Sequence, residues 1–261
     1  MFLLGYILYE VLHDLVPRQV ATADSHGFAL LHAEQHLGVA CEQLLNQWLA
    51  ARPTLAAFTI FWYSDAHFAV TVGLLLLTAK ISGGRRWRLA WYVTTAIALL
   101  VFWLDPTAPP RLLPHAGFTD VVALLPSFGT VSDPAIVRLS NPFAAMPSLH
   151  VAWATWCAAM IWRLSLTSDP RLRPWVARSR ARITCWALRV LAVAYPLITT
   201  WVVLATANHY LADVLAGVLT GALAFGLTSR RVTAMGRNLR RSAALQQQGP
   251  GRPCSEACAR E

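Results

Sequence analysis

The sequence predicts an all-α protein, a polytopic membrane helical bundle of about six transmembrane helices. Of its 261 residues, 56% are hydrophobic and only 13% are charged, and the mean hydropathy is +0.46. The apolar residues gather in runs of about 15–25 residues, close to the length that a helix needs to cross ~30 Å of hydrocarbon. Amphipathic helices of soluble domains show interrupted apolar stripes instead.

The apolar runs place the spans at about residues 1–16, 55–79, 88–105, 143–163, 184–206 and 208–228. The first run begins at the initiator methionine and carries Glu10, His13 and Asp14. It is similar to a signal peptide but lacks a basic start and a small-residue cleavage site. We therefore predict a short or truncated N-terminal anchor helix.

The net charge of +9 rests on 22 basic residues, of which all but Lys80 are arginine. With six spans and a cytoplasmic N-terminus, 18 of these cations fall in inside segments, and four fall outside: Arg18, Arg52, Arg111 and Arg138. This distribution satisfies the positive-inside rule. The basic excess therefore indicates membrane topology and contact with anionic headgroups, and not nucleic-acid binding.

Two segments between the spans have patterns of their own. Residues 25–50 carry apolar side chains at helical spacing, which is typical of an amphipathic helix in the outer interface or, equally, of a surface helix packed on the bundle. The loop after the third span is 37 residues long and contains six prolines. Pro109 and Pro110 restrict the backbone just before Arg111 and should hold its guanidinium in place, whereas Asp120 is expected to be solvated.

Ionisable side chains are costly inside a membrane, so each of them is a candidate functional residue. His209 and Asp213 stand four residues apart in "ANHYLADVLAG", on one face of the predicted sixth helix. The carboxylate can accept a hydrogen bond from one imidazole nitrogen, which leaves the other nitrogen free as a nucleophile. His150 lies near the outer end of the fourth span, and we expect it at a depth similar to that of His209.

Two histidines, one of them backed by a carboxylate, suit phosphoryl or phosphodiester transfer. The first attacks phosphorus and becomes phosphorylated, while the second protonates the leaving oxygen. Arg111 can hold the phosphate oxygens and stabilise the charge of the transition state. A single membrane histidine is more often a packing residue, so the prediction depends on the joint arrangement.

Three stretches resemble a known family. "MPSLH" at 146–150 and "HYLAD" at 209–213 are similar to the second and third signature motifs of the type-2 phosphatidic acid phosphatase superfamily, specifically of its inositol phosphorylceramide synthase-like (inositolphosphotransferase) branch. "PTAPPRLLP" at 106–114 is similar to the proline-rich stretch of that branch. The resemblance covers roughly residues 60–228.

The resemblance implies a six-helix bundle with a lumenal or extracytoplasmic site that needs no metal or other cofactor. It implies that His209 is the nucleophile, Asp213 its orienting partner and His150 the general acid. The phosphatase branch has an arginine where Val203 stands here, and a lysine upstream of its first-motif arginine, whereas Lys80 is predicted inside. These departures favour a transferase.

Ser148 in "MPSLH" and His67 in "FWYSDAHFAV" join Arg111 as candidate substrate-binding residues. For His67 two interpretations remain: it contacts substrate or supports the site, or it makes an interhelical hydrogen bond. Gly217 and Gly221, four residues apart, predict a small-residue face for close helix packing.

The resulting hypothesis is an integral membrane phosphotransferase that acts through phosphohistidine on a phospholipid or polyprenyl-phosphate-type substrate, with a polyol or lipid as acceptor. The alternatives are a lipid phosphate phosphatase with water as acceptor, and a non-catalytic transporter or lipid-binding scaffold whose histidines relay protons. The predicted organisation is an anchor at 1–16, an outer interfacial segment at 17–54, a membrane catalytic domain at 55–228 and a basic disordered tail at 229–261. The site is expected to face the extracytoplasmic side, and the tail the cytoplasm.

Overall fold

The computed structural model describes residues 20–124, 143–166 and 181–228. The predicted first span at 1–16 and the tail at 229–261 lie outside the described residues. Within the described ranges the main helices are the following: α2 (Val20–His36), α3 (Glu42–Ala50), α4 (Pro53–Phe61), α5 (His67–Leu77), α6 (Gly84–Leu104), α7 (Val121–Leu124), α9 (Leu149–Leu166), α10 (Ala181–Ala205) and a last helix, Leu211–Thr228.

Four helical stretches are long and apolar enough to cross a membrane: Pro53–Leu77, Gly84–Leu104, Ile183–Ala205 and Leu211–Thr228. The first of them joins α4 and α5 through a π-helical turn, η1. Large apolar side chains such as Leu104, Leu197 and Leu219 remain exposed on these helices, as expected where lipid surrounds a bundle. The chain is therefore an integral membrane protein with a helical bundle.

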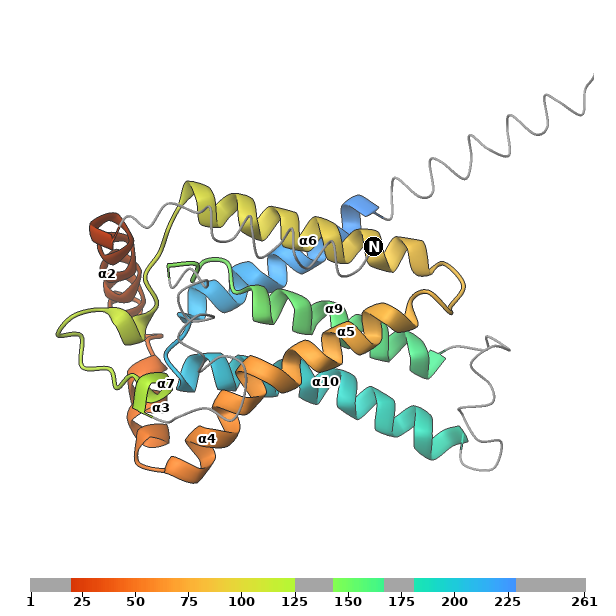
Figure 1. The fold of residues 1–261 in the computed structure, drawn as a ribbon, viewed down its shortest axis with the longest axis horizontal. Helices are drawn as coiled ribbons and strands as arrows, with labels where there is room; N and C mark the ends of the chain where they lie inside the picture. The colour runs from red at the N-terminus through yellow and green to blue at the C-terminus, as the bar shows by residue number, and fades with distance from the viewer. Residues whose placement is uncertain (1–19, 125–142, 167–180, 229–261) are drawn as a thin grey trace, which may run out of the picture.

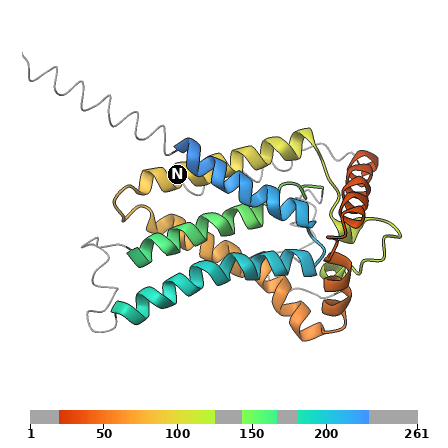
Figure 2. The same ribbon diagram turned by 180° about the vertical axis from the view of Figure 1, so that it is seen from behind.

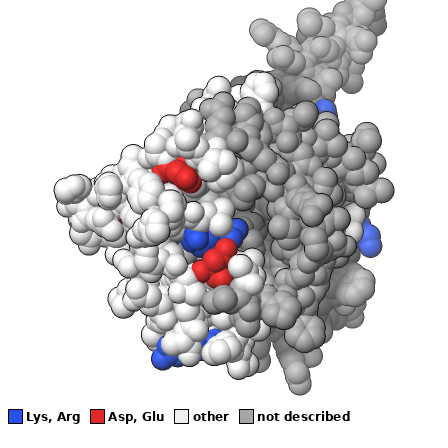
Figure 3. Space-filling model, turned by 60° about the vertical axis from the view of Figure 1, so that its left-hand side comes forward, with Lys and Arg blue, Asp and Glu red and all other residues white. Residues whose placement is uncertain are grey.

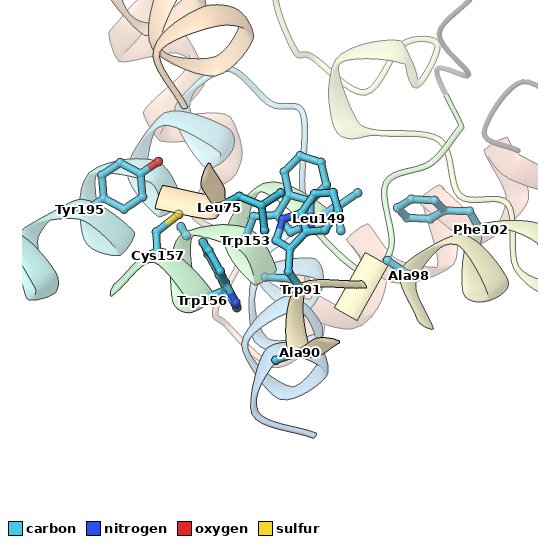
Figure 4. Close-up of a cluster of buried hydrophobic side chains, with 12 residues drawn as sticks. Leu75, Ala90, Trp91, Ala98, Phe102, Leu149, Trp153, Trp156, Cys157 and Tyr195 are labelled. Carbon is cyan, nitrogen blue, oxygen red and sulfur yellow. The ribbon is translucent and has the colours of Figure 1, made fainter. Parts of the chain in front are cut away.

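The predicted fourth span corresponds to α9, which lies in the middle of the bundle (Figures 1 and 2). It packs most extensively on α10 and also against α5 and α6. Its aromatic residues form the core with those of its neighbours (Figure 4): the Trp153 ring stacks on Trp91 of α6 at 5.1 Å, and its indole N–H donates to Thr95 Oγ1 at 3.0 Å. The core thus fixes α9 on several sides.

Two predicted span boundaries are wrong at their N-terminal ends. The fourth span was expected from about residue 143, but α9 begins at Leu149, because residues 143–148 form a turn and bends, and Ala144 pairs with Thr107 in an isolated bridge. Pro147 therefore lies just before the helix. The sixth span was expected from residue 208, but the last helix begins at Leu211.

The segment at 25–50 forms two helices, α2 and α3, where one amphipathic helix was predicted. Gly38 interrupts them with a φ of +69°, a conformation that favours glycine. Both helices lie at one end of the bundle, and α2 runs across it (Figure 1). Leu31 and Leu49 are buried there, so both helices pack on the bundle.

The last helix approaches the start of α9 closely, as its two glycines predicted. A Cβ atom at Gly217 would lie only 2.5 Å from the carbonyl oxygen of Ser148, so this contact requires glycine. At Gly221 the nearest atom would be 3.4 Å away, which is ordinary contact. Glycine at 217 therefore brings together the two helix starts near which the predicted histidines lie.

Candidate active site

The loop between α10 and the last helix carries His209. Ala207 adopts a left-handed backbone conformation with a φ of +52°, which turns the chain directly after α10. The N–H groups of Asn208 and His209 both donate to the carbonyl oxygen of Val203, at 3.0 and 3.3 Å. Val203, which stands where the phosphatase branch has an arginine, thus helps to hold this loop.

Hydrogen bonds determine the tautomer of His209, whose side chain is only 5% exposed. Its Nδ1 lies 2.8 Å from the carbonyl oxygen of Ala145 and 3.3 Å from Asp213 Oδ2. Because a carbonyl oxygen only accepts, Nδ1 carries the hydrogen. Nε2 of the neutral ring therefore carries the lone pair, and it has no hydrogen-bond partner among the described residues.

Asp213 acts on both the ring and the backbone of this loop. We predicted His209 and Asp213 on one face of a continuous helix, but His209 precedes the last helix and Asp213 lies in its first turn. The Asp213 Oδ2 atom accepts from the backbone N–H of Tyr210 at 2.9 Å as well as from the His209 ring. The carboxylate thus caps the helix start and orients the imidazole.

His150 lies in the first turn of α9, and its ring centroid is 6.1 Å from that of His209. Tyr63 stacks on the His150 ring at 4.0 Å. Tyr63 belongs to η1 (Trp62–Ala66), and π-helical turns are frequent at functional sites. Nε2 of His150 is buried without a partner among the described residues, so each of the two neighbouring imidazoles keeps one free nitrogen.

Arg111 lies in η2 (Pro110–Leu112), and three contacts hold it. Its backbone N–H donates to the carbonyl of Ala207 at 3.0 Å, and its Nε donates to Asn208 Oδ1 at 2.8 Å. One terminal nitrogen forms an ion pair with Asp120 at 2.9 Å. The expectation that Asp120 is solvated is therefore wrong, because it anchors the guanidinium. A guanidinium has five N–H donors, and those left over can bind phosphate oxygens.

Ser148 connects the starts of the two helices. Its buried side-chain oxygen accepts from the backbone N–H of Val151 at 3.4 Å, at the start of α9. Its own N–H donates to the carbonyl of Asp213 at 3.0 Å. These contacts give Ser148 a structural role, and its contact with substrate stays a prediction.

His67 is fully buried beside His150, with 5.2 Å between the ring centroids. Its Nδ1 lies 2.9 Å from the hydroxyl of Tyr195 on α10. The interhelical hydrogen bond that we predicted as one alternative is therefore present. The ring also lies next to a candidate catalytic histidine, and contact with substrate stays a prediction.

The environment of His209 favours its neutral form. Burial lowers the pKa of His209 to about 4, although the hydrogen bond to the Ala145 carbonyl opposes the shift, and the positive charge of Arg111 lowers the pKa further. An imidazole in this environment is neutral at pH 7, so its Nε2 lone pair is available.

A depression of about 310 Å³ opens between α2 and the segment after α6. Its lining includes an ion pair between His26 and Asp105, 2.7 Å apart, but none of the predicted catalytic residues. Thr107, also in the lining, accepts the N–H of Ala145 at 3.3 Å, so the depression borders the segment that holds the His209 ring. Among the described residues on the face shown in Figure 3, charged side chains are sparse.

Sequence reasoning missed several groups around these histidines. Asn208 was a detectable candidate, because it is a polar residue next to His209 in an apolar run. Tyr195 gave no signal of its own, because aromatic residues are common in apolar helices. The Ala145 carbonyl gave none either, because a backbone atom has no sequence signature.

These features define a helical membrane protein with a buried histidine, carboxylate and arginine site at one end of its bundle. The chain matches the family model of the PAP2 superfamily over residues 28–227, and it belongs to that superfamily. It is accordingly a phosphatase or phosphotransferase that acts on phosphate esters. Among curated proteins and among solved structures, none matches the chain significantly.

Proposed function

We propose that the protein is a phosphotransferase that acts on a lipid-linked phosphate or phosphodiester, like the inositol phosphorylceramide synthase-like branch, and forms a phosphohistidine at His209. The observation that carries this proposal is the state of the His209 ring. Its Nδ1 donates to the Ala145 carbonyl, and its Nε2 has no partner among the described residues. The centroid of its ring lies 6.1 Å from that of His150. A buried imidazole with one fixed N–H and one free lone pair is suited to attack phosphorus.

In the first half of the reaction, Nε2 of His209 attacks phosphorus, and an N–P bond forms. The bond from phosphorus to the oxygen of the leaving alcohol breaks, and His150, which takes up a proton when the phosphate anion binds beside it, gives that proton to the leaving oxygen. The cation that develops on the His209 ring is stabilised by Asp213 through Nδ1, at 3.3 Å.

In the second half, the hydroxyl of the acceptor gives its proton to the now neutral His150 and attacks phosphorus. The N–P bond breaks, and both histidines return to their starting states. The remaining donors of Arg111 hold the phosphate oxygens through both halves, which lowers the cost of the charge that gathers on them. Ser148 and His67 support this site from the α9 and α5 sides.

We further propose that this end of the bundle faces the extracytoplasmic side, with the tail at 229–261 in the cytoplasm. The distribution of arginines supports this orientation. A cysteine placed at Leu112 should react with an impermeant thiol reagent on intact cells. If this cysteine is labelled only in broken cells, the proposed orientation is wrong and this end of the bundle faces the cytoplasm.

The choice between transfer and hydrolysis is tested with the purified full chain in lipid vesicles. A phospholipid donor labelled in its headgroup phosphate is supplied with and without a polyol, inositol, or a lipid alcohol. We expect the labelled phosphate to appear on the acceptor. If free phosphate is the sole product in all mixtures, the protein is a lipid phosphate phosphatase. If the chain binds the phospholipid without turning it over, it is a scaffold.

The pH dependence of kcat/KM should reflect the lowered pKa of His209. Protonation of Nε2 removes the lone pair, so activity is lost as the pH falls through the pKa of the free enzyme's nucleophile. Because that pKa is about 4, we expect the acid limb near pH 4 and not near 6.5, the ordinary value. Return of each sample to pH 7 controls for acid denaturation. A reversible limb near pH 6.5 would contradict the proposed environment of His209.

A further inference from the structure

The start of the last helix is held by two glutamates from the segment that precedes the spans. Glu34 of α2 and Glu42, the first residue of α3, are 4% and 0% exposed. Both helices lie at the end of the bundle where the chain passes from α10 into the last helix (Figures 1 and 2). A carboxyl group is rarely buried this deeply without a specific partner.

The partners of these glutamates are successive backbone groups. Glu42 Oε1 accepts from the N–H of Leu211 at 2.8 Å, and Glu34 Oε1 accepts from the N–H of Ala212 at 2.7 Å. Asp213 Oδ2 accepts the hydrogen bond from the N–H of Tyr210. The first N–H groups of a helix have no partner within the helix, and here three in a row are satisfied by three carboxyl groups.

The second oxygen of each glutamate has no such partner. Oε2 of Glu34 and Oε2 of Glu42 are both buried without a hydrogen-bond partner among the described residues. The two carboxyl groups are neighbours, because they bind consecutive N–H groups. Two buried anions side by side are costly. One proton between them gives both oxygens a partner and removes one charge.

The electrostatics of Glu34 agree with this arrangement. Burial, opposed by the hydrogen bond from Ala212, raises the pKa of Glu34 to about 7, and Glu42 and the negative charge of Asp213 add to the rise. The partial positive charge of the helix N-terminus stabilises the one anion that remains. Among the described residues, no group of three or more His, Cys, Asp or Glu side chains is arranged to hold a metal ion.

We propose that Glu34 and Glu42 are positioning residues that share one proton and cap the last helix, and that they thereby fix His209 for attack. This inference rests on the role proposed for His209. His209 lies two residues before Leu211, the first residue whose N–H a glutamate caps, so fraying of the helix start would move its Nε2 away from the reacting phosphorus. The segment at 17–54, which was predicted only to lie in the outer interface, then contributes to catalysis.

The test compares single and double glutamine variants of the full chain. In Glu34→Gln or Glu42→Gln alone, the amide oxygen accepts from the backbone and the NH₂ group donates to the remaining carboxylate, which replaces the shared proton. We expect kcat within about threefold of wild type. In the double variant two NH₂ groups meet, or one backbone N–H is left unpaired, so kcat should fall by about tenfold or more with KM little changed.

Two controls separate positioning from general damage. Gln35→Ala, at an exposed neighbouring position of α2, should behave as wild type, and thermal unfolding in detergent should show each variant folded at the assay temperature. If each single variant loses as much kcat as the double variant, the two glutamates do not share a proton. If the double variant keeps the wild-type kcat, the glutamates do not position His209. His209→Ala in the same assay tests the underlying function separately: if it keeps full turnover, the proposed function fails, whatever the glutamates do.

Discussion

His209→Ala is expected to lower kcat by about 10⁴-fold or more, because the covalent route is lost with the nucleophile. The loss should fall on kcat more than on KM, because the lone pair acts in the reaction and the proposed phosphate contact of Arg111 remains. Turnover of a radiolabelled phospholipid by the purified chain measures the effect. Wild type should also retain an acid-labile, alkali-stable label on the protein after rapid quenching, and the variant should not.

The matched control for this variant is His36→Ala. His36 is an exposed histidine at the end of α2, so its removal should leave both turnover and labelling intact. Undiminished turnover of His209→Ala, or an equal amount of trapped label on it, would exclude His209 as the nucleophile.

His150→Ala is expected to lower kcat on a phospholipid donor by about 10²- to 10⁴-fold, the usual contribution of a general acid or base. The reason is that an alkoxide is a poor leaving group unless it is protonated as the bond breaks. A nitrophenyl ester leaves as a stable anion and does not need that proton. Formation of the phosphoenzyme from the nitrophenyl ester should therefore be much less impaired than its formation from the lipid.

The comparison of the two substrates distinguishes the proposed role from a structural one. If His150 only packs against Tyr63 and His67, its removal should impair both substrates equally. An equal loss of phosphoenzyme formation with both esters would therefore reject His150 as general acid, while His209 could still be the nucleophile. Thermal unfolding of the variant in detergent shows whether the bundle remains folded.

Much of the membrane architecture could be predicted from apolar runs, but the helix starts next to the site could not. Hydropathy does not detect that residues 143–145 pair with Thr107, or that Ala207 turns the chain before the last helix. These features depend on hydrogen bonds between segments far apart in the sequence. They place His209 in a loop, where its backbone is held by Val203 of α10 and its ring by Ala145 and Asp213.

The candidate site divides in the same way. The sequence by itself determined the membrane class of the chain and the side-chain chemistry available at His150, His209, Asp213 and Arg111, because apolar runs and costly ionisable groups are visible one residue at a time. Only the tertiary structure decided which imidazole nitrogen is free and that Glu34 and Glu42 cap the last helix. The physical reason is that these properties belong to contacts, such as the 2.8 Å hydrogen bond from His209 to a backbone carbonyl, which exist only when distant segments meet.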